Sequence, residues 1–187
     1  MPVLMLPALK RGRPTVRALI RTLLALSVAL PSAGWSASSD RAFEEKSWLE
    51  IEARLPPFPL PENLIPFFVS ATSDNSFMID GESLSVDADG VVRFTLLIVS
   101  PSGARNVSYE GMRCATGERR LYALGRSDKT WSKARNDQWL PIKDNSLNRH
   151  YAELYSAYFC AIGVNLRDAD DARRALRHGG HPSTKQH

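Results

Sequence analysis

The segment 91–99 constrains the fold of this chain more than any other stretch. Its side chains alternate, so that Val92, Phe94, Leu96 and Ile98 share one fully apolar face while the opposite face is mixed. Alternation with a period of two predicts a β-strand, and one continuous apolar face is typical of a central strand covered by a helix layer. The surrounding chain must therefore supply neighbouring strands and at least one packed helix.

The residues that follow predict an antiparallel meander. Ser100-Pro101-Ser102-Gly103 fits a type I turn, with proline at the second position and glycine at the fourth. We expect the chain to return through 104–114 and to continue as a third strand over 119–124. Shorter apolar runs at 67–69 and 77–79 predict further strands ahead of this hairpin, with turns at Asp80-Gly81 and 87–90.

Two helices are expected in the C-terminal third. Within 148–162, one helix face is formed by Tyr151, Leu154, Tyr155, Tyr158 and Ile162. A second helix over 168–177 begins with acidic residues and ends with basic ones, which suits the helix dipole.

The N-terminal part of the domain is predicted to contain a short helix and an extended segment. Trp48, Ile51 and Leu55 lie at helical spacing and predict a short amphipathic helix within 40–55. Four prolines within 56–61 exclude a helix or a central strand there and predict an extended segment across the surface.

The predicted class is therefore α+β: an antiparallel sheet of about four to six strands, a helix packed on one face and a single disulfide. A single domain is expected over 40–177 and a disordered tail over 178–187.

Residues 1–34 have the order of a signal peptide. Five basic residues precede an apolar run over 22–30, and small or turn-forming residues follow at 31–34. The run of nine residues is far shorter than the roughly 20 that a bilayer span needs, so no stable membrane anchor is expected. The expected location is periplasmic or secreted, and the cleavage position stays open.

Charge gives no sign of a nucleic-acid partner once the leader is set aside. The whole chain has 24 Lys and Arg against 20 Asp and Glu, but five of the basic residues and none of the acids lie in 1–34. The remainder has 19 basic and 20 acidic residues. A net charge near zero does not favour nucleic acid or an anionic membrane as partner.

The chain has two cysteines, Cys114 and Cys160. In an exported protein, an even number of cysteines predicts a disulfide, and two allow a single pairing. The alternative is a pair of free thiols. There is no C-x-x-C motif, and two cysteines without well-placed histidines make a poor zinc site, so no metal is expected.

Several blocks of the sequence together resemble a known family. They comprise the run 89–96, the turn 100–104, the segment 106–114, Trp131, Ala134-Arg135, Trp139 and Tyr158-Phe159-Cys160. On these residues the chain resembles the cryptic-neisserial-protein-like family of small exported proteins, over roughly 48–165. The resemblance implies an exported single-domain protein of unassigned activity. It provides no catalytic residue to carry over.

The first candidate site lies on the strand 104–114. Tyr109, Glu110 and Arg113 form its densest polar cluster, and a bulge at Gly111 would place Glu110 and Arg113 on one face. A Glu–Arg pair close to Arg119 and Arg135 could then bind a carboxylate or phosphate, because a guanidinium pairs with such groups in bidentate fashion. The alternative is a structural salt bridge at a sheet edge.

The second candidate site is a shallow groove formed by Trp131 and Trp139 with Arg135 between them. Indole rings offer flat apolar area to sugars or peptides, and arginine stacks on such rings. The alternative is that both indoles cap the core.

These features predict a soluble exported binding or interaction protein that has no cofactor and no catalytic residues. Its partner would be an envelope protein, a peptide or a glycan. Two other functions stay open: a small cell-envelope hydrolase with an unrecognised site, and an accessory protein of an envelope complex that engages through 56–61. A binding module should show an open groove near Trp131, a hydrolase should place His150 or a carboxylate of raised pKa in a closed pocket, and an accessory protein should show an exposed apolar patch.

Overall fold

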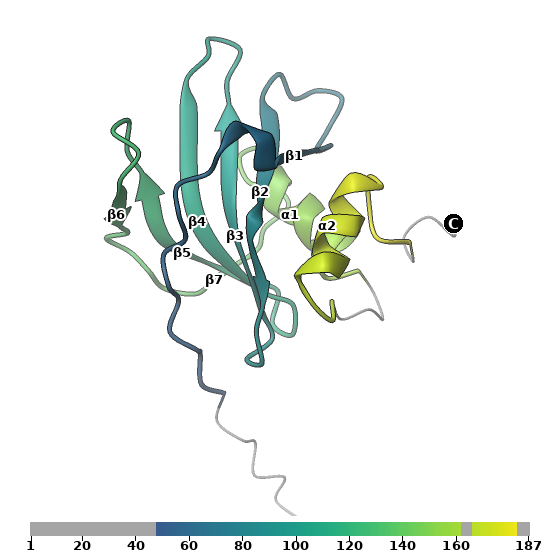
Figure 1. The fold of residues 1–187 in the computed structure, drawn as a ribbon. Coiled ribbons are helices and arrows are strands. Elements are labelled where there is room, and N and C mark those ends of the chain that lie inside the picture. The colour runs from purple at the N-terminus through teal and green to yellow at the C-terminus, as the bar shows by residue number, and fades with distance from the viewer. Residues whose placement is uncertain (1–47, 162–165, 183–187) are drawn as a thin grey trace, which may run out of the picture. The chain divides into compact units, whose positions relative to one another are not determined.

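The computed structural model describes residues 48–161 and 166–182. Its strands form one antiparallel sheet in the order β1-β2-β3-β4-β5-β6, with β7 paired to β5 beside this path (Figure 1). The strands are β1 (Leu64–Phe67), β2 (Ser76–Val86), β3 (Val91–Val99), β4 (Arg105–Arg113), β5 (Glu118–Gly125), β6 (Trp131–Lys133) and β7 (Leu140–Pro141). Consecutive strands are neighbours, so the predicted meander and the predicted α+β class are confirmed.

Strand β3 has the predicted bounds and lies between β2 and β4. Its apolar face, with Val92, Phe94 and Leu96, belongs to the main hydrophobic core. The predicted turn closes with a hydrogen bond of 2.9 Å from the Gly103 N–H to the Ser100 carbonyl. Gly103 has a φ of +84°, a conformation that glycine adopts without a steric penalty.

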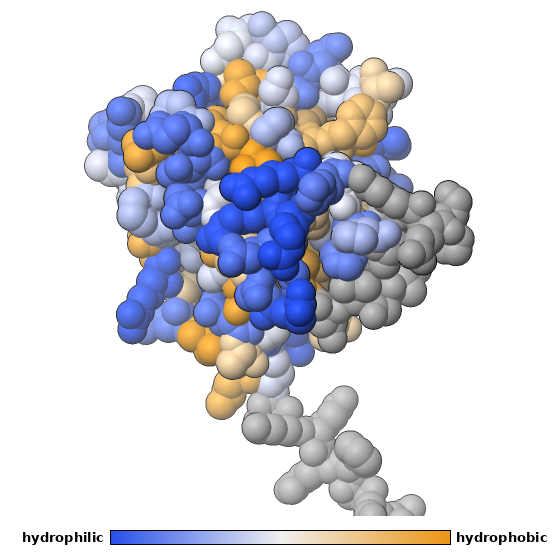
Figure 2. Space-filling model, turned by 45° about the vertical axis from the view of Figure 1, so that its right-hand side comes forward, coloured by the Kyte–Doolittle hydropathy of each residue, from blue (hydrophilic) through white to orange (hydrophobic). Residues whose placement is uncertain are grey.

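The helices cover this apolar face of the sheet (Figure 1). Helix α1 (Arg149–Glu153) continues directly into the π-helix η2 (Leu154–Phe159), and together they form the first predicted helix. Helix α2 (Ala169–Arg177) is capped by the side chain of Asp168, which accepts a hydrogen bond from the Asp171 N–H. Figure 2 turns this side toward the viewer and shows a strongly hydrophilic area in the middle of the view, where α2 carries its charged residues.

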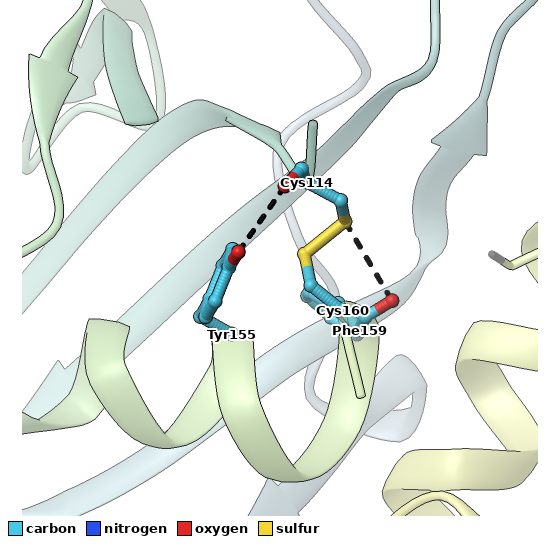
Figure 3. Close-up of a disulfide and its surroundings, with 4 residues drawn as sticks. All are labelled: Cys114, Tyr155, Phe159 and Cys160. Carbon is cyan, nitrogen blue, oxygen red and sulfur yellow. Dashed lines mark hydrogen bonds between the residues drawn. A yellow bond between two sulfur atoms is a disulfide. The ribbon is translucent and has the colours of Figure 1, made fainter. Parts of the chain in front are cut away.

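The disulfide joins the end of β4 to the end of the helix. Cys114 and Cys160 are bonded, with their Cα atoms 5.2 Å apart (Figure 3). The hydroxyl of Tyr155 donates a hydrogen bond of 3.2 Å to the Cys114 carbonyl, which adds a second link at the same point. The predicted disulfide is therefore confirmed, and it attaches the helix to the hairpin.

Two local predictions are wrong. The described residues 48–55 are extended and contain no helix, because their polar groups bond to the sheet and because prolines follow at 56 and 57. Asp80-Gly81 is not a turn: both residues lie within β2, where the register against β3 shifts between Asp80 and Ser85. Such an irregularity accommodates extra residues without ending the strand.

Several predictions fall outside the described residues, including the leader at 1–34 and the last five residues of the predicted tail. The described part of the tail contacts the domain, since the His181 N–H donates to the Ala157 carbonyl at 2.7 Å and Gly180 is buried. Among the described residues, no helix is both long enough and apolar enough to span a bilayer.

Candidate functional site

The extended segment 48–60, which we call the strap, crosses the sheet on the face opposite the helices. In Figure 1 it is the dark blue trace that passes in front of the strands on its way to β1. Side-chain hydrogen bonds link it to distant residues at several points. Trp48 Nε1 donates to the Asp89 carbonyl at 2.8 Å, Trp131 Nε1 donates to the Pro56 carbonyl at 2.8 Å, and an Arg93 amino group donates to the Ile51 carbonyl at 2.7 Å. The strap is thus held along its length by side chains of the sheet and its loops.

Glu50 is the most highly bonded residue of the strap. Its carboxylate accepts hydrogen bonds from the Tyr122 hydroxyl at 2.6 Å and from Trp139 Nε1 at 3.0 Å, and it forms an ion pair with Arg120. Burial, together with the bond to Glu50, raises the pKa of Tyr122 well above its usual value. Tyr122 is therefore a neutral donor, and the sheet face provides a complete binding site for this carboxylate.

Arg93 lies beneath the strap with its side chain only 2% exposed. It pairs with Asp89 at 2.7 Å and with Asp87 at 2.8 Å, and it lies 3.6 Å from Glu50. Burial alone would lower the pKa of Arg93, but the bond to Asp89 and the nearby charges raise it above its usual value. The pKa of Asp89 is lowered even though burial opposes this, because Arg93 and two backbone N–H groups donate to the carboxylate.

The two tryptophans predicted to share a groove contact different parts of the strap. Trp131 packs against Phe58, with ring centroids 5.4 Å apart, whereas Trp139 packs edge-on against Trp48 at 5.8 Å. Arg135 is exposed and lies outside both ring pairs. The structure therefore places the strap where the sequence predicted an open aromatic groove.

The cluster predicted on β4 is divided between the two faces of the sheet. Tyr109 and Arg113 lie on the strap face, where the Arg113 guanidinium stacks 3.8 Å from the centre of the Trp48 ring. Glu110 points to the helix side. The irregularity against β5 lies between Tyr109 and Glu110, so a bulge at Gly111 does not bring Glu110 and Arg113 together.

Gly111 makes room for the Tyr122 ring and does not form the predicted bulge. A Cβ at this position would lie 2.4 Å from the Tyr122 hydroxyl oxygen, so the Tyr122 ring packs directly over the glycine. Because glycine has no side chain, the Tyr122 ring can pack against the backbone of Gly111, and in this position its hydroxyl donates to Glu50.

Glu110 belongs to a buried polar network under the helix. Its carboxyl group, 1% exposed, accepts hydrogen bonds from Ser108 Oγ at 2.5 Å and from the Tyr151 hydroxyl at 3.0 Å, while Arg119 lies 4.0 Å away. Burial raises the pKa of Glu110. No sequence pattern connects Tyr151 with Glu110, since they are 41 positions apart and belong to different elements.

His150 lies beside this network, on the wall of a polar pocket. It is 8% exposed, and its ring stacks on Phe77 at 5.4 Å and contacts Tyr151 at 4.0 Å. Burial, together with the positive charge of Arg119, lowers the pKa of His150 to about 4, so the imidazole is neutral at pH 7. Among the described residues, His150 makes no hydrogen bond with Ser108 or Glu110 of the kind that a catalytic triad needs.

Two open grooves flank the strap. One, of about 430 Å³, lies between the strap and Arg120, Tyr122, Lys133 and Asp137. The other, of about 470 Å³, lies between the strap and the irregular part of β2, with Tyr109 and Arg93 in its lining. In the part of the chain that the structure describes, no group of three or more His, Cys, Asp or Glu side chains could hold a metal ion.

The fold and this face define a disulfide-bonded α+β domain in which one sheet face is covered by helices and the other by an extended strap. A model of the CNP1-like family matches residues 43–177. The chain therefore belongs to the CNP1-like family, which confirms the resemblance found in its sequence. No curated protein and no solved structure shows significant similarity to it.

Proposed function

We propose that this protein is an exported interaction module that binds a partner protein of the cell envelope through the outer edge of its strap. One observation carries the proposal: four large apolar side chains of the strap face solvent. They are Leu49, Ile51, Leu55 and Leu60, with exposed fractions of 80%, 46%, 50% and 50%. Single exposed leucines are ordinary, but a close series of them is typical of a surface that another molecule covers.

The way in which the strap is held supports this role. Bonds from Trp48, Trp131, Arg93 and the groups around Glu50 fix its inner edge and leave its outer edge free. A segment that is already ordered loses less conformational entropy on binding, so more of the contact energy becomes affinity. The proline-rich part, 56–61, adds an extended backbone of the type that aromatic-lined grooves recognise.

The surroundings of the strap suit the rim of an interface. Glu52, Arg54 and Lys133 line the flanking grooves, and within the described residues none of the three forms an ion pair. An apolar centre with a charged rim is the usual composition of a protein interface, where the rim charges set orientation and association rate. The proposed export depends on the leader and agrees with the disulfide.

The test is site-specific photo-crosslinking in cells that export the full chain. A photoreactive residue at Leu49 or Leu55 is expected to give one discrete higher-mass adduct. The same residue at Leu147, which is 84% exposed and lies outside the strap, is the matched control. The proposal fails if the strap positions yield no more adduct than Leu147. It also fails if the adduct is a homodimer, since the strap would then contact a second copy.

A double variant, Leu49→Ser with Leu55→Ser, separates binding from folding. Both side chains are exposed, so the melting temperature should change little. When added as purified protein, this variant should not compete for the adduct, whereas the unmodified protein should.

A further inference from the structure

A polar pocket on the helix side of the sheet, remote from the strap face, has the composition of a ligand site. This pocket, which we call the His150 pocket, has a volume of about 370 Å³ and lies between the loop 69–75 and residues 146–150. Its polar walls are formed by four hydroxyl and two amide side chains: Ser70, Thr72, Ser73, Ser146, Asn75 and Asn106. The volume is within the range of small-molecule sites.

The lining of the His150 pocket carries positive charge and no negative charge. Arg149 contributes a positive charge, and no Asp or Glu lines the pocket. Asp144 lies outside the lining, 4.0 Å from Arg149, and both side chains are largely exposed, so their pairing is weak and leaves the guanidinium available. The grooves beside the strap differ, since each contains acidic side chains.

His150 supplies the second observation that points to a ligand. The residue is more than nine-tenths buried, yet its Nε2 atom has no hydrogen-bond partner among the described residues. An unsatisfied buried polar atom is costly, and solvent does not reach this one in the structure, so a bound molecule satisfies Nε2 once the ring turns toward the pocket that His150 lines. The neutral ring either donates or accepts at Nε2, according to its tautomer.

We infer that the His150 pocket binds a carboxylate-bearing sugar, of the uronic acid class. Arg149 would pair with the carboxylate, while the hydroxyl and amide side chains would exchange hydrogen bonds with the sugar hydroxyls in both directions. Phe77 and Ile98 in the lining offer apolar area to the C–H face of the ring. This inference is independent of the strap interface, because it concerns the other face of the sheet.

The test is titration calorimetry of the disulfide-intact protein with glucuronate, glucose and acetate. Glucose has the same ring without the carboxylate, and acetate has the carboxylate without the ring. Glucuronate is expected to bind roughly tenfold or more tightly than either, because a charge-assisted hydrogen bond is lost with glucose and the ring contacts are lost with acetate. Equal affinity for all three, or no binding of glucuronate, would overturn the inference.

Two substitutions assign any binding to this pocket. Arg149→Gln should weaken glucuronate binding roughly tenfold and leave glucose binding unchanged, whereas Arg135→Gln, the same charge change at an exposed arginine elsewhere, should alter neither. His150→Phe keeps an aromatic ring against Phe77 and removes Nε2, so it should weaken both sugars. If Arg149→Gln and Arg135→Gln behave alike, the sugar is bound elsewhere and the inference is wrong. Amide chemical shifts of Asn75 and Asn106 on titration give an independent readout.

Discussion

Arg93 is the residue at which the sheet and the strap are joined. Its guanidinium bonds to Asp87 and Asp89 on one side and to the Ile51 carbonyl on the other. Removing one partner from a buried ion pair leaves the remaining charges without compensation, which costs more than the pair itself contributes. Arg93→Met should therefore lower the free energy of unfolding by about 3 kcal/mol or more, measured by urea denaturation.

Arg167→Met is the matched control for that change. Arg167 also pairs with an aspartate four positions away, but its side chain is 78% exposed. Exposed pairs contribute little because water screens them. Equal destabilisation by the two variants would show that burial is not what makes Arg93 important.

The lowered pKa of His150 makes the free energy of unfolding depend on pH, with a sign that can be worked out. Its pKa is about 4 in the folded chain and near 6.5 when unperturbed, so between these values the unfolded chain binds more protons than the folded one. Acidification from pH 7 to pH 5 should therefore lower the free energy of unfolding by about 1–2 kcal/mol through this group alone. Glu110, whose pKa is raised, acts in the opposite direction as the pH falls.

Comparison with His150→Gln isolates this contribution, because the other titrating groups are common to both proteins. The variant should lose less stability than the unmodified protein over the same interval, as measured by urea denaturation at each pH. Parallel pH profiles would mean that His150 does not remain neutral in the folded state.

At the scale of elements, the attachment of the strap to the sheet depends on the carboxylate of Glu50. Glu50 accepts from Tyr122 and Trp139 and pairs with Arg120, so Glu50→Gln keeps the shape and removes the charge. Hydrogen exchange at the Ile51 amide, which donates to Asp89, should accelerate about tenfold, while β3 amides keep their protection. Glu52→Gln, an exposed carboxylate on the same strap, is the control and should leave exchange at Ile51 unchanged.

The elements that could be predicted from the sequence are those whose pattern is local. The alternation in β3 and the helical spacing from Tyr151 to Tyr158 each repeat over a few residues, and both elements form as expected. The strap could not be predicted in this way, because its bonds join residues 38 to 89 positions apart. Its apolar spacing resembles that of a helix, yet tertiary contacts determine its conformation.

The same limit explains the outcome at the candidate sites. Trp131 and Trp139 were predicted to line an open groove, but their hydrogen-bond partners lie on the strap and could not be inferred from spacing. Glu50 and Arg93 were missed. Arg93 did carry a signal, since it is the one charged residue of a mostly apolar strand, and such a residue needs a buried acid nearby. Asp87 and Asp89 were assigned to a turn, which concealed that pairing.

At the scale of the whole molecule, the disulfide connects the sheet to the helix that covers it. It links positions 46 apart and holds the helix to the end of β4. Constraint of the unfolded chain by a loop of this size should contribute about 4 kcal/mol. The double variant Cys114→Ala with Cys160→Ala should lose about that much free energy of unfolding in urea. A loss below about 1 kcal/mol would show that helix packing alone holds this end of the domain.

Export is the prediction that concerns the leader, and one mass spectrum tests it together with the oxidation state of the two cysteines. If the leader directs the chain to an oxidising compartment, the protein purified from the envelope should begin near Gly34. Its intact mass should be about 2 Da below that of the reduced form, because two thiol hydrogens are lost on oxidation. A chain that retains residues 1–34 and has two titratable thiols would contradict the predicted compartment. The five basic residues of the leader would then belong to the working protein, and its net charge would favour nucleic acid or an anionic membrane as partner.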